Sequence, residues 1–211
     1  MVSRKRLFLI VLITAALTLL LAIAPDRGTF PSTSDIIALQ TARQNGADFE
    51  EWRWLAAYVS VHPHQAHVWE RMGVLDYRND LCQQASVEFG LAEGYGSLSS
   101  PSIIFYAECL MTLNKPQEVV HLLEPHLEDK EKPDGLYPLL ARAYLEQDDY
   151  DRAFLILSNW VEGEPENSQA VYALGLYQAL TDPNGALLSL RRAADLDPVV
   201  EESYHVMQTA I

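Results

Sequence analysis

The chain has 211 residues, and its 15 Lys and Arg face 29 Asp and Glu, which gives a formal net charge of −14. Beyond residue 30 eleven basic residues remain against twenty-eight acidic ones, a net charge of −17. This balance excludes recognition of nucleic-acid phosphates by electrostatics, because no basic stripe is present. The acidity favours solubility, or attraction to a basic partner.

Residues 7–24 form an apolar run of eighteen residues without a charge. Arg4, Lys5 and Arg6 precede the run and Pro25 ends it. At about 1.5 Å per residue a helix of this length reaches roughly 27 Å, close to the hydrocarbon thickness of a bilayer. We therefore expect one transmembrane helix, with residues 1–6 in the cytoplasm and everything after it outside the cell membrane.

Two fates are open for this segment, a retained signal anchor and a cleaved signal peptide. The run is longer than the core of most signal peptides, and Pro25 directly follows the small residues Ala22 and Ala24. Both features favour retention. Cleavage would instead give a secreted soluble module.

Residues 25–31 predict a short, fairly stiff linker because of their prolines. Residues 32–65 keep the spacing of the repeats described below, with Gly46 at a turn between helices and Pro63 at the closing place. Asp35, Leu39 and Glu51 stand where an aromatic and two small residues are expected. We interpret this segment as a degenerate first repeat or cap.

Four units with a period of 34 residues follow, at 66–99, 100–133, 134–167 and 168–200. Their eighth place is always small, and a small residue recurs near the twentieth place of three of them. A small residue there lets two helices cross closely or receives the large residue of the other helix. The eighth-place residues are Gly73, Ala107, Ala141 and Gly175, and the later ones are Ala85, Ala153 and Ala186.

The best-preserved residues are Trp69, Gly73, Ala85, Phe89 and Ala92 in the first unit, Tyr137, Leu140, Ala141, Tyr144, Ala153, Leu157 and Pro165 in the third, and Leu174, Gly175, Ala186, Leu190, Ala193 and Pro198 in the fourth. This pattern resembles the tetratricopeptide repeat (TPR) family. The resemblance implies an all-α fold, a right-handed superhelix of antiparallel helix pairs. Val119 and Trp160 depart from the pattern, and the fourth unit is one residue short.

Helices are expected in pairs, with a short C-terminal capping helix at 201–211. The acidic residues Asp148, Asp149 and Asp151 fall at a turn and the beginning of a helix, so we expect capping rather than catalysis. The predicted helices cover 34–45 and 48–61, 66–79 and 81–93, 101–113 and 116–127, 135–147 and 150–162, and 168–180 and 184–196.

The resemblance also implies that the first helices of the pairs line a concave groove that binds a partner. The groove would be mixed in character, which suits a peptide or partner helix, although an ordinary solvated face is the alternative. The implied residues are His67, Glu70, Val74, Tyr77, Arg78, Ile104, Glu108, Met111, Arg142, Leu145, Glu146, Gln169, Tyr172 and Leu176, with Thr112 and Leu180 beside them.

Few residues suggest other chemistry. His62, His64 and His67 lie close together in sequence, but exposed loop residues are favoured over a metal site. Cys82 and Cys109 would lie side by side in a solenoid and could form a disulfide outside the cytoplasm, while two independent buried thiols are the alternative. No catalytic or phosphate-binding motif is present, so we expect neither an enzyme nor a cofactor.

These observations favour a membrane-anchored TPR protein that acts as a scaffold or assembly factor for a membrane-associated complex. The alternative is a permanent accessory subunit of such a complex. The sequence predicts a protein partner and no nucleic acid.

Overall fold

A computed structural model of the chain describes residues 46–200. The chain divides into two units, one up to Gln65 and one from Ala66 onward. The expected membrane helix at 7–24, linker at 25–31, helix at 34–45 and capping helix at 201–211 lie outside the described residues. Within residues 46–200 no helix combines the length and apolar character needed to cross a bilayer.

The described part of the first unit is helix α3 (Asp48–Val61). Three acidic residues in its first turn favour the positive end of the helix dipole. Its buried residues, Glu51, Leu55 and Val59, are four apart and therefore share one face of the helix. The helix ends two residues before Pro63, where the sequence predicts the end of the unit.

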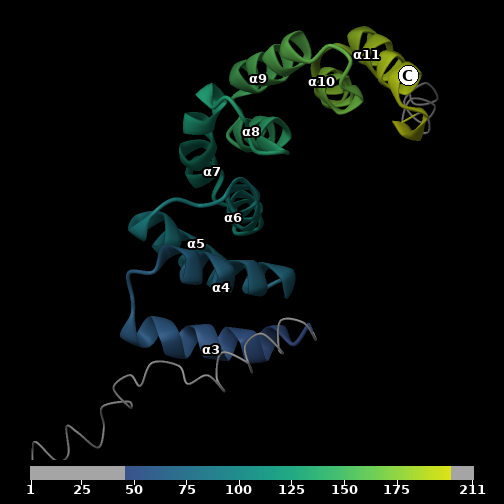
Figure 1. Cartoon of the computed structure of the whole chain (residues 1–211). Coiled ribbons are helices and arrows are strands. Elements are labelled where there is room, and N and C mark those ends of the chain that lie inside the picture. Colours follow the sequence, from purple (N-terminus) through teal and green to yellow (C-terminus); the bar gives the residue numbers. More distant parts are fainter. Residues whose placement is uncertain (1–45, 201–211) are drawn as a thin grey trace, which may run out of the picture. The chain divides into compact units, whose positions relative to one another are not determined.

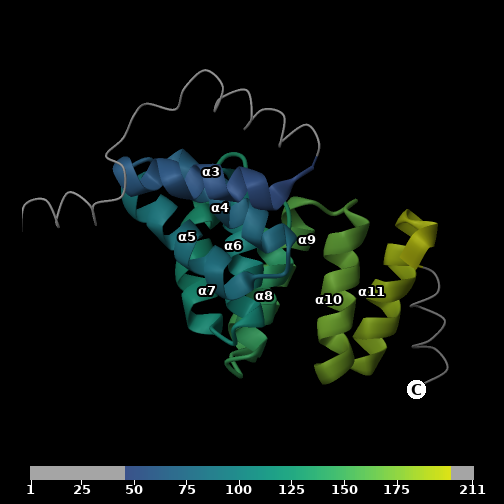
Figure 2. The ribbon, with the colours of Figure 1, turned by 90° about the horizontal axis from the view of Figure 1, so that it is seen from below.

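The second unit contains four successive helix pairs in its described part (Figure 1). Their order agrees with the pairs expected from the period, and Figures 1 and 2 both show α10 lying beside α11. The pairs are α4 (Ala66–Arg78) with α5 (Cys82–Tyr95), α6 (Ser100–Thr112) with α7 (Pro116–Leu123), α8 (Leu136–Leu145) with α9 (Tyr150–Gly163), and α10 (Ser168–Thr181) with α11 (Pro183–Leu196).

In the first and fourth pairs of the second unit, the two helices cross closely where a glycine has no side chain. A Cβ atom on Gly73 would lie 2.8 Å from Cδ1 of Phe89, whose side chain is fully buried. A Cβ on Gly175 would lie 2.9 Å from Cγ of Leu190. Both distances are too short for non-bonded carbons, so the expectation that a small residue faces a large one is confirmed at both crossings.

The turns inside the first three pairs of the second unit share one backbone conformation, and Gly46 before α3 has it too. Gly46, Asp80, Asn114 and Asp148 have φ of 67°, 60°, 57° and 58°, and they are spaced by 34 residues. Glycine, asparagine and aspartate enter this left-handed region most readily. The equivalent Asp182 has an extended φ of −143°, because the fourth repeat is one residue short at this turn. The turns are closed by the N–H groups of Leu81, Lys115 and Asp149, which donate to Asp76, Leu110 and Tyr144 carbonyls.

Helix α7 is shorter than the helix expected at 116–127. It ends at Leu123, and a 3-10 helix, η1 (Glu124–Glu128), continues the chain. Pro125 causes this change, because proline has no N–H to donate and its ring clashes with the carbonyl four residues earlier.

One apolar cluster runs through the second to fourth repeats. Leu123, Leu136 and Leu140 are completely buried within it. Trp160, which departs from the family pattern, also belongs to this cluster and stacks on Tyr137 with ring centroids 5.2 Å apart. The large residue therefore fills space between two helices of the same repeat.

We expect Gly73→Ala to lower the free energy of unfolding by about 1–2 kcal/mol. The added methyl group collides with the buried Phe89 ring, and overpacking of this kind outweighs the gain in helix propensity. Urea unfolding followed by circular dichroism measures the change.

Gly94→Ala is the matched control. Gly94 lies in the same helix as Phe89, but a Cβ there meets nothing within 4 Å. The substitution should raise stability by up to about 1 kcal/mol through helix propensity alone. Equal responses at Gly73 and Gly94 would contradict the proposed role of the crossing.

Candidate protein-binding face

The first helices of the repeats supply the candidate site. Helix α4 contacts α6, and α6 contacts α8. Figure 1 shows α6, α8 and α10 on one side of the row, with α7, α9 and α11 on the other. We call the exposed side of α4, α6, α8 and α10 the first-helix face.

The residues predicted for a groove differ widely in exposure. Ile104 and Met111 are only 9% and 5% exposed and belong to the apolar cluster, so they add little contact surface. The half-buried residues are Glu70, Val74, Tyr77, Glu108, Leu145 and Tyr172. The exposed ones are His67, Arg78, Thr112, Arg142, Glu146, Gln169, Leu176 and Leu180.

Two of the predicted residues are joined across repeats, from α4 to α6. The hydroxyl of Tyr77 donates to Oε2 of Glu108, and the Tyr77 ring stacks on Phe105 with centroids 4.5 Å apart. The hydrogen bond to the carboxylate, together with burial and the negative charge, raises the pKa of Tyr77 to about 12. This end of the face is therefore an ordered polar and aromatic cluster.

Glu70 accepts hydrogen bonds at the N-terminus of α6, the first helix of the next repeat. Its Oε1 accepts a hydrogen bond of 2.9 Å from the backbone N–H of Ser99, which precedes α6, and a second one from the Ser99 hydroxyl. Burial acts to raise the pKa of Glu70, but hydrogen bonds from Ser99 and Ser102 outweigh it and the pKa is lowered. The carboxylate thus stays charged near the positive end of the α6 dipole.

Charges in the middle of the face are paired. Nε of Arg142 lies 3.1 Å from Oε1 of Glu146, one helical turn further along α8. Both side chains are partly exposed, so the pair adds little to stability. It leaves this part of the face with charges of both signs.

Helix α10 presents an apolar stripe. Leu176 and Leu180 are 45% and 68% exposed, and their spacing of four places them on the same side of the helix. Tyr172, four residues earlier, is half-buried on the same side. Exposed leucines in this arrangement can pack against apolar side chains of another molecule.

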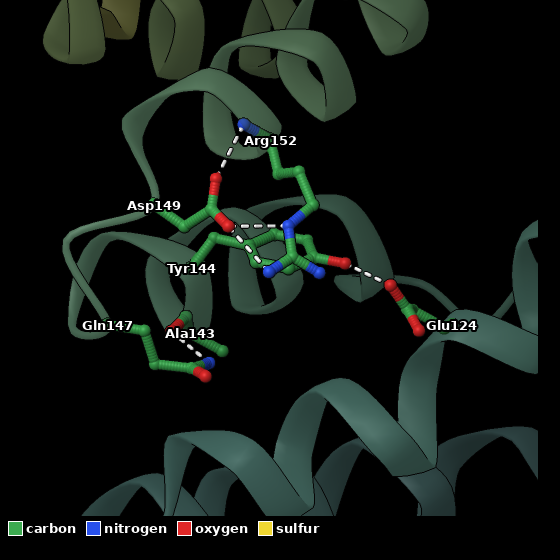
Figure 3. A network of polar contacts seen from close by, with 6 residues as sticks. All are labelled: Glu124, Ala143, Tyr144, Gln147, Asp149 and Arg152. Carbon is green, nitrogen blue, oxygen red and sulfur yellow. Dashed lines mark hydrogen bonds and ion pairs between the residues drawn. The ribbon is translucent and has the colours of Figure 1, made fainter.

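A polar network that the groove prediction did not include lies between the second and third repeats (Figure 3). Tyr144 donates its hydroxyl proton to Glu124, and the Arg152 guanidinium lies 4.6 Å from the centre of the Tyr144 ring. Asp149 accepts a 3.1 Å hydrogen bond from the backbone N–H of Arg152, which caps α9. The predicted capping role is confirmed for Asp149. The network as a whole joins the second repeat to the third.

A hollow on the other side of α6 was also not predicted. It lies among α5, α6 and α7, away from the first-helix face. Its lining residues are Glu93, Tyr106, Leu110, Gln117, Glu118, His121 and Leu122. We assign it no chemistry.

The two cysteines lie together as the sequence predicted. Their Sγ atoms are 2.6 Å apart, and both thiols are free. Burial is the main cause that raises the pKa of the Cys109 thiol. Among residues 46–200 no group of three or more His, Cys, Asp or Glu side chains could hold a metal ion.

Comparison with known proteins supports the fold. No protein-family model matches the chain, and no curated protein matches it in sequence. Several solved structures are similar at the level of the fold. They define the described helices as an all-helical, TPR-like repeat fold.

Three of these structures illustrate the likeness. YrrB, a TPR protein with an unusual peptide-binding site, gives a TM-score of 0.69 at 15% identity, over 82% of this chain and 89% of its own. MamA from Desulfovibrio magneticus gives 0.64 at 16%, over 76% and 92%. TTC0263, a TPR protein of Thermus thermophilus, gives 0.57 at 11%, over 81% and 95%.

We expect Glu108→Gln to lower the pKa of Tyr77 from about 12 toward 10. The substitution removes the negative acceptor that holds the phenol neutral. Tyrosinate absorbance between pH 9 and about 13 measures the ionisation. Between pH 10 and 12 the folded Tyr77 is neutral while the unfolded one is ionised, so stability falls as pH rises through this window and Glu108→Gln should reduce that fall.

Tyr77→Phe supplies the control for this titration. In a chain that carries Tyr77→Phe, Glu108→Gln should leave the absorbance curve unchanged, because the tyrosine whose pKa it lowers is no longer present. A similar change in both backgrounds would show that another tyrosine responds. Tyr144, whose pKa burial and Glu124 also raise to about 12, should keep its value throughout.

Proposed function

We propose that the chain is a membrane-anchored TPR-type scaffold that binds another protein through its first-helix face during assembly of a membrane-associated complex. The exposure of Leu176 and Leu180 on α10 is the observation that carries this proposal. Helix α10 belongs to the first-helix face, and exposed apolar side chains on such a face are suited to contact with a partner.

The chemistry of the face favours a peptide or helix with both apolar and basic residues. Leucines four apart match the spacing of apolar side chains on a partner helix. The strongly acidic composition after residue 30 would attract basic groups and speed their encounter. Tyr77 and Glu108, fixed by their hydrogen bond, offer an aromatic ring and a charge in a defined place.

Likeness to other repeat proteins adds support only at the level of fold. YrrB carries a peptide-binding site, and the present chain has a similar arrangement of helices at 15% identity. The membrane part of the proposal rests on the sequence of residues 7–24 and the basic residues before them.

Replacing Leu176 and Leu180 together by Asp should weaken partner binding at least about tenfold, because two apolar contacts are lost and two like charges are added. The full chain, tagged and carrying a photo-crosslinker at Leu176, would be recovered from membranes and its crosslinked proteins identified by mass spectrometry. The variant should lose the partner that this crosslinker identifies.

Leu188→Asp is the matched control, since Leu188 is 72% exposed but belongs to α11, a second helix. It should retain the partner, and a crosslinker at Leu188 should not reach it. If the variant with both Leu176 and Leu180 replaced still retained the partner, the proposal would be wrong. Equimolar recovery of the partner would favour an accessory subunit, and transient recovery an assembly factor.

The anchor is tested separately. The full chain should stay in the membrane pellet after an alkaline carbonate wash, and residues 26–211 expressed without the apolar run should not. A mature N-terminus at Pro25 or later, determined by mass spectrometry, would show cleavage and replace the anchored scaffold by a secreted module.

A further inference from the structure

The two cysteines of the chain meet at the seam between the first two repeats. Cys82 is the first residue of α5, and Cys109 lies in α6 of the next repeat. Their Sγ atoms are 2.6 Å apart, within reach of a bond after a small adjustment. Both cysteines are free thiols in the structure. Because their sulfur atoms already lie close together, a disulfide between them requires an oxidant and no large movement of the helices.

Repeat geometry brings these positions together. Cys82 occupies the seventeenth place of its repeat and Cys109 the tenth place of the following one, a separation of 27 residues. Tyr150 and Tyr177 hold the same two places in the third and fourth repeats, and the Tyr177 hydroxyl donates to the Tyr150 carbonyl at 3.0 Å.

At the seam between the second and third repeats, apolar residues occupy the same two places. Pro116 and Ala143 are both buried and are again 27 residues apart. The seventeenth and tenth places are thus a recurring joint between a second helix and the next first helix. The cysteines occupy that joint between the first and second repeats.

We propose that Cys82 and Cys109 are a modification site, a dithiol that an oxidant of the disulfide class converts into a disulfide joining α5 to α6. This inference does not depend on the proposed scaffold function.

Burial sets the order of the reaction. Cys82 is partly exposed, whereas Cys109 is completely buried, so the oxidant meets Cys82 first. The Cys82 thiolate attacks one sulfur of the oxidant's disulfide, whose S–S bond breaks and releases the first thiol. Burial raises the pKa of Cys109, which makes it the slower, resolving thiol.

The second step completes the balance. The Cys109 thiolate attacks Sγ of Cys82, the mixed disulfide breaks, and the second thiol of the oxidant leaves. Two electrons and two protons pass from the pair of cysteines to the oxidant, which becomes two thiols. No other reactant is needed.

The bond would fasten one end of the first-helix face. Glu108 directly precedes Cys109, and Tyr77, Cys82 and Phe105 pack against the same small apolar cluster. A covalent link between α5 and α6 therefore holds the two helix pairs that carry the Tyr77 and Glu108 hydrogen bond. Oxidation should restrict relative motion of these repeats.

The test equilibrates the full chain in detergent with oxidised glutathione or with dithiothreitol, quenches it in acid and counts thiols by maleimide labelling of the denatured protein. After oxidation we expect no free thiol, a mass lower by two hydrogen atoms, and a peptide pair linked through Cys82 and Cys109. The melting temperature should be roughly 5–10 °C higher than in dithiothreitol.

Single variants separate the bond from other effects of oxidation. Cys82→Ser changes a partly exposed side chain and should fold normally, while Cys109→Ala keeps the buried place apolar. In both variants the difference in melting temperature between oxidant and reductant should vanish. Amide exchange in α6 should slow on oxidation of the wild-type chain alone.

Three results would overturn the inference. They are survival of both thiols in oxidised glutathione, a glutathione adduct on Cys82 that Cys109 does not displace, and dimers linked through Cys82. A bond that forms without raising the melting temperature would overturn its stabilising role.

Discussion

Close crossing of the two helices in each repeat is the constraint on which the rest of the second unit depends. Phe89 lies over the backbone at Gly73, and Leu190 over the backbone at Gly175, at distances that leave no room for a Cβ atom. Because the pair is this narrow, the next first helix can contact the preceding second helix, as α6 does with α5. The joints between repeats and the first-helix face follow from that spacing.

Much of this architecture could be predicted from the sequence because its causes are local. Small residues at a fixed place reveal the crossing, as Gly73 and Gly175 show. The left-handed turns at Asp80, Asn114 and Asp148 also have a signal, since residues that tolerate positive φ recur every 34 positions. The early end of α7 at Leu123 was not predicted, although its cause, Pro125, is also local.

The candidate site was less predictable, because the place of a residue in a repeat indicates which side of the helix it lies on but not how deeply it is buried. Ile104 and Met111 occupy places implied for a groove, yet neighbouring repeats bury them. Glu70 and Glu108 likewise find partners 29 and 31 residues away along the chain, Ser99 and Tyr77. Such contacts depend on how two repeats meet, which periodicity does not specify.

These internal contacts divide the first-helix face into regions with different capacities. A carboxylate that already accepts hydrogen bonds, like that of Glu70 or Glu108, gains little from a partner unless an existing bond is replaced. Leu176 and Leu180 are exposed and their side chains form no hydrogen bonds, so covering them removes apolar surface from water without replacing a hydrogen bond. On the proposed function, α10 would therefore supply most of the affinity, while the ordered cluster around Tyr77 would select which partner fits.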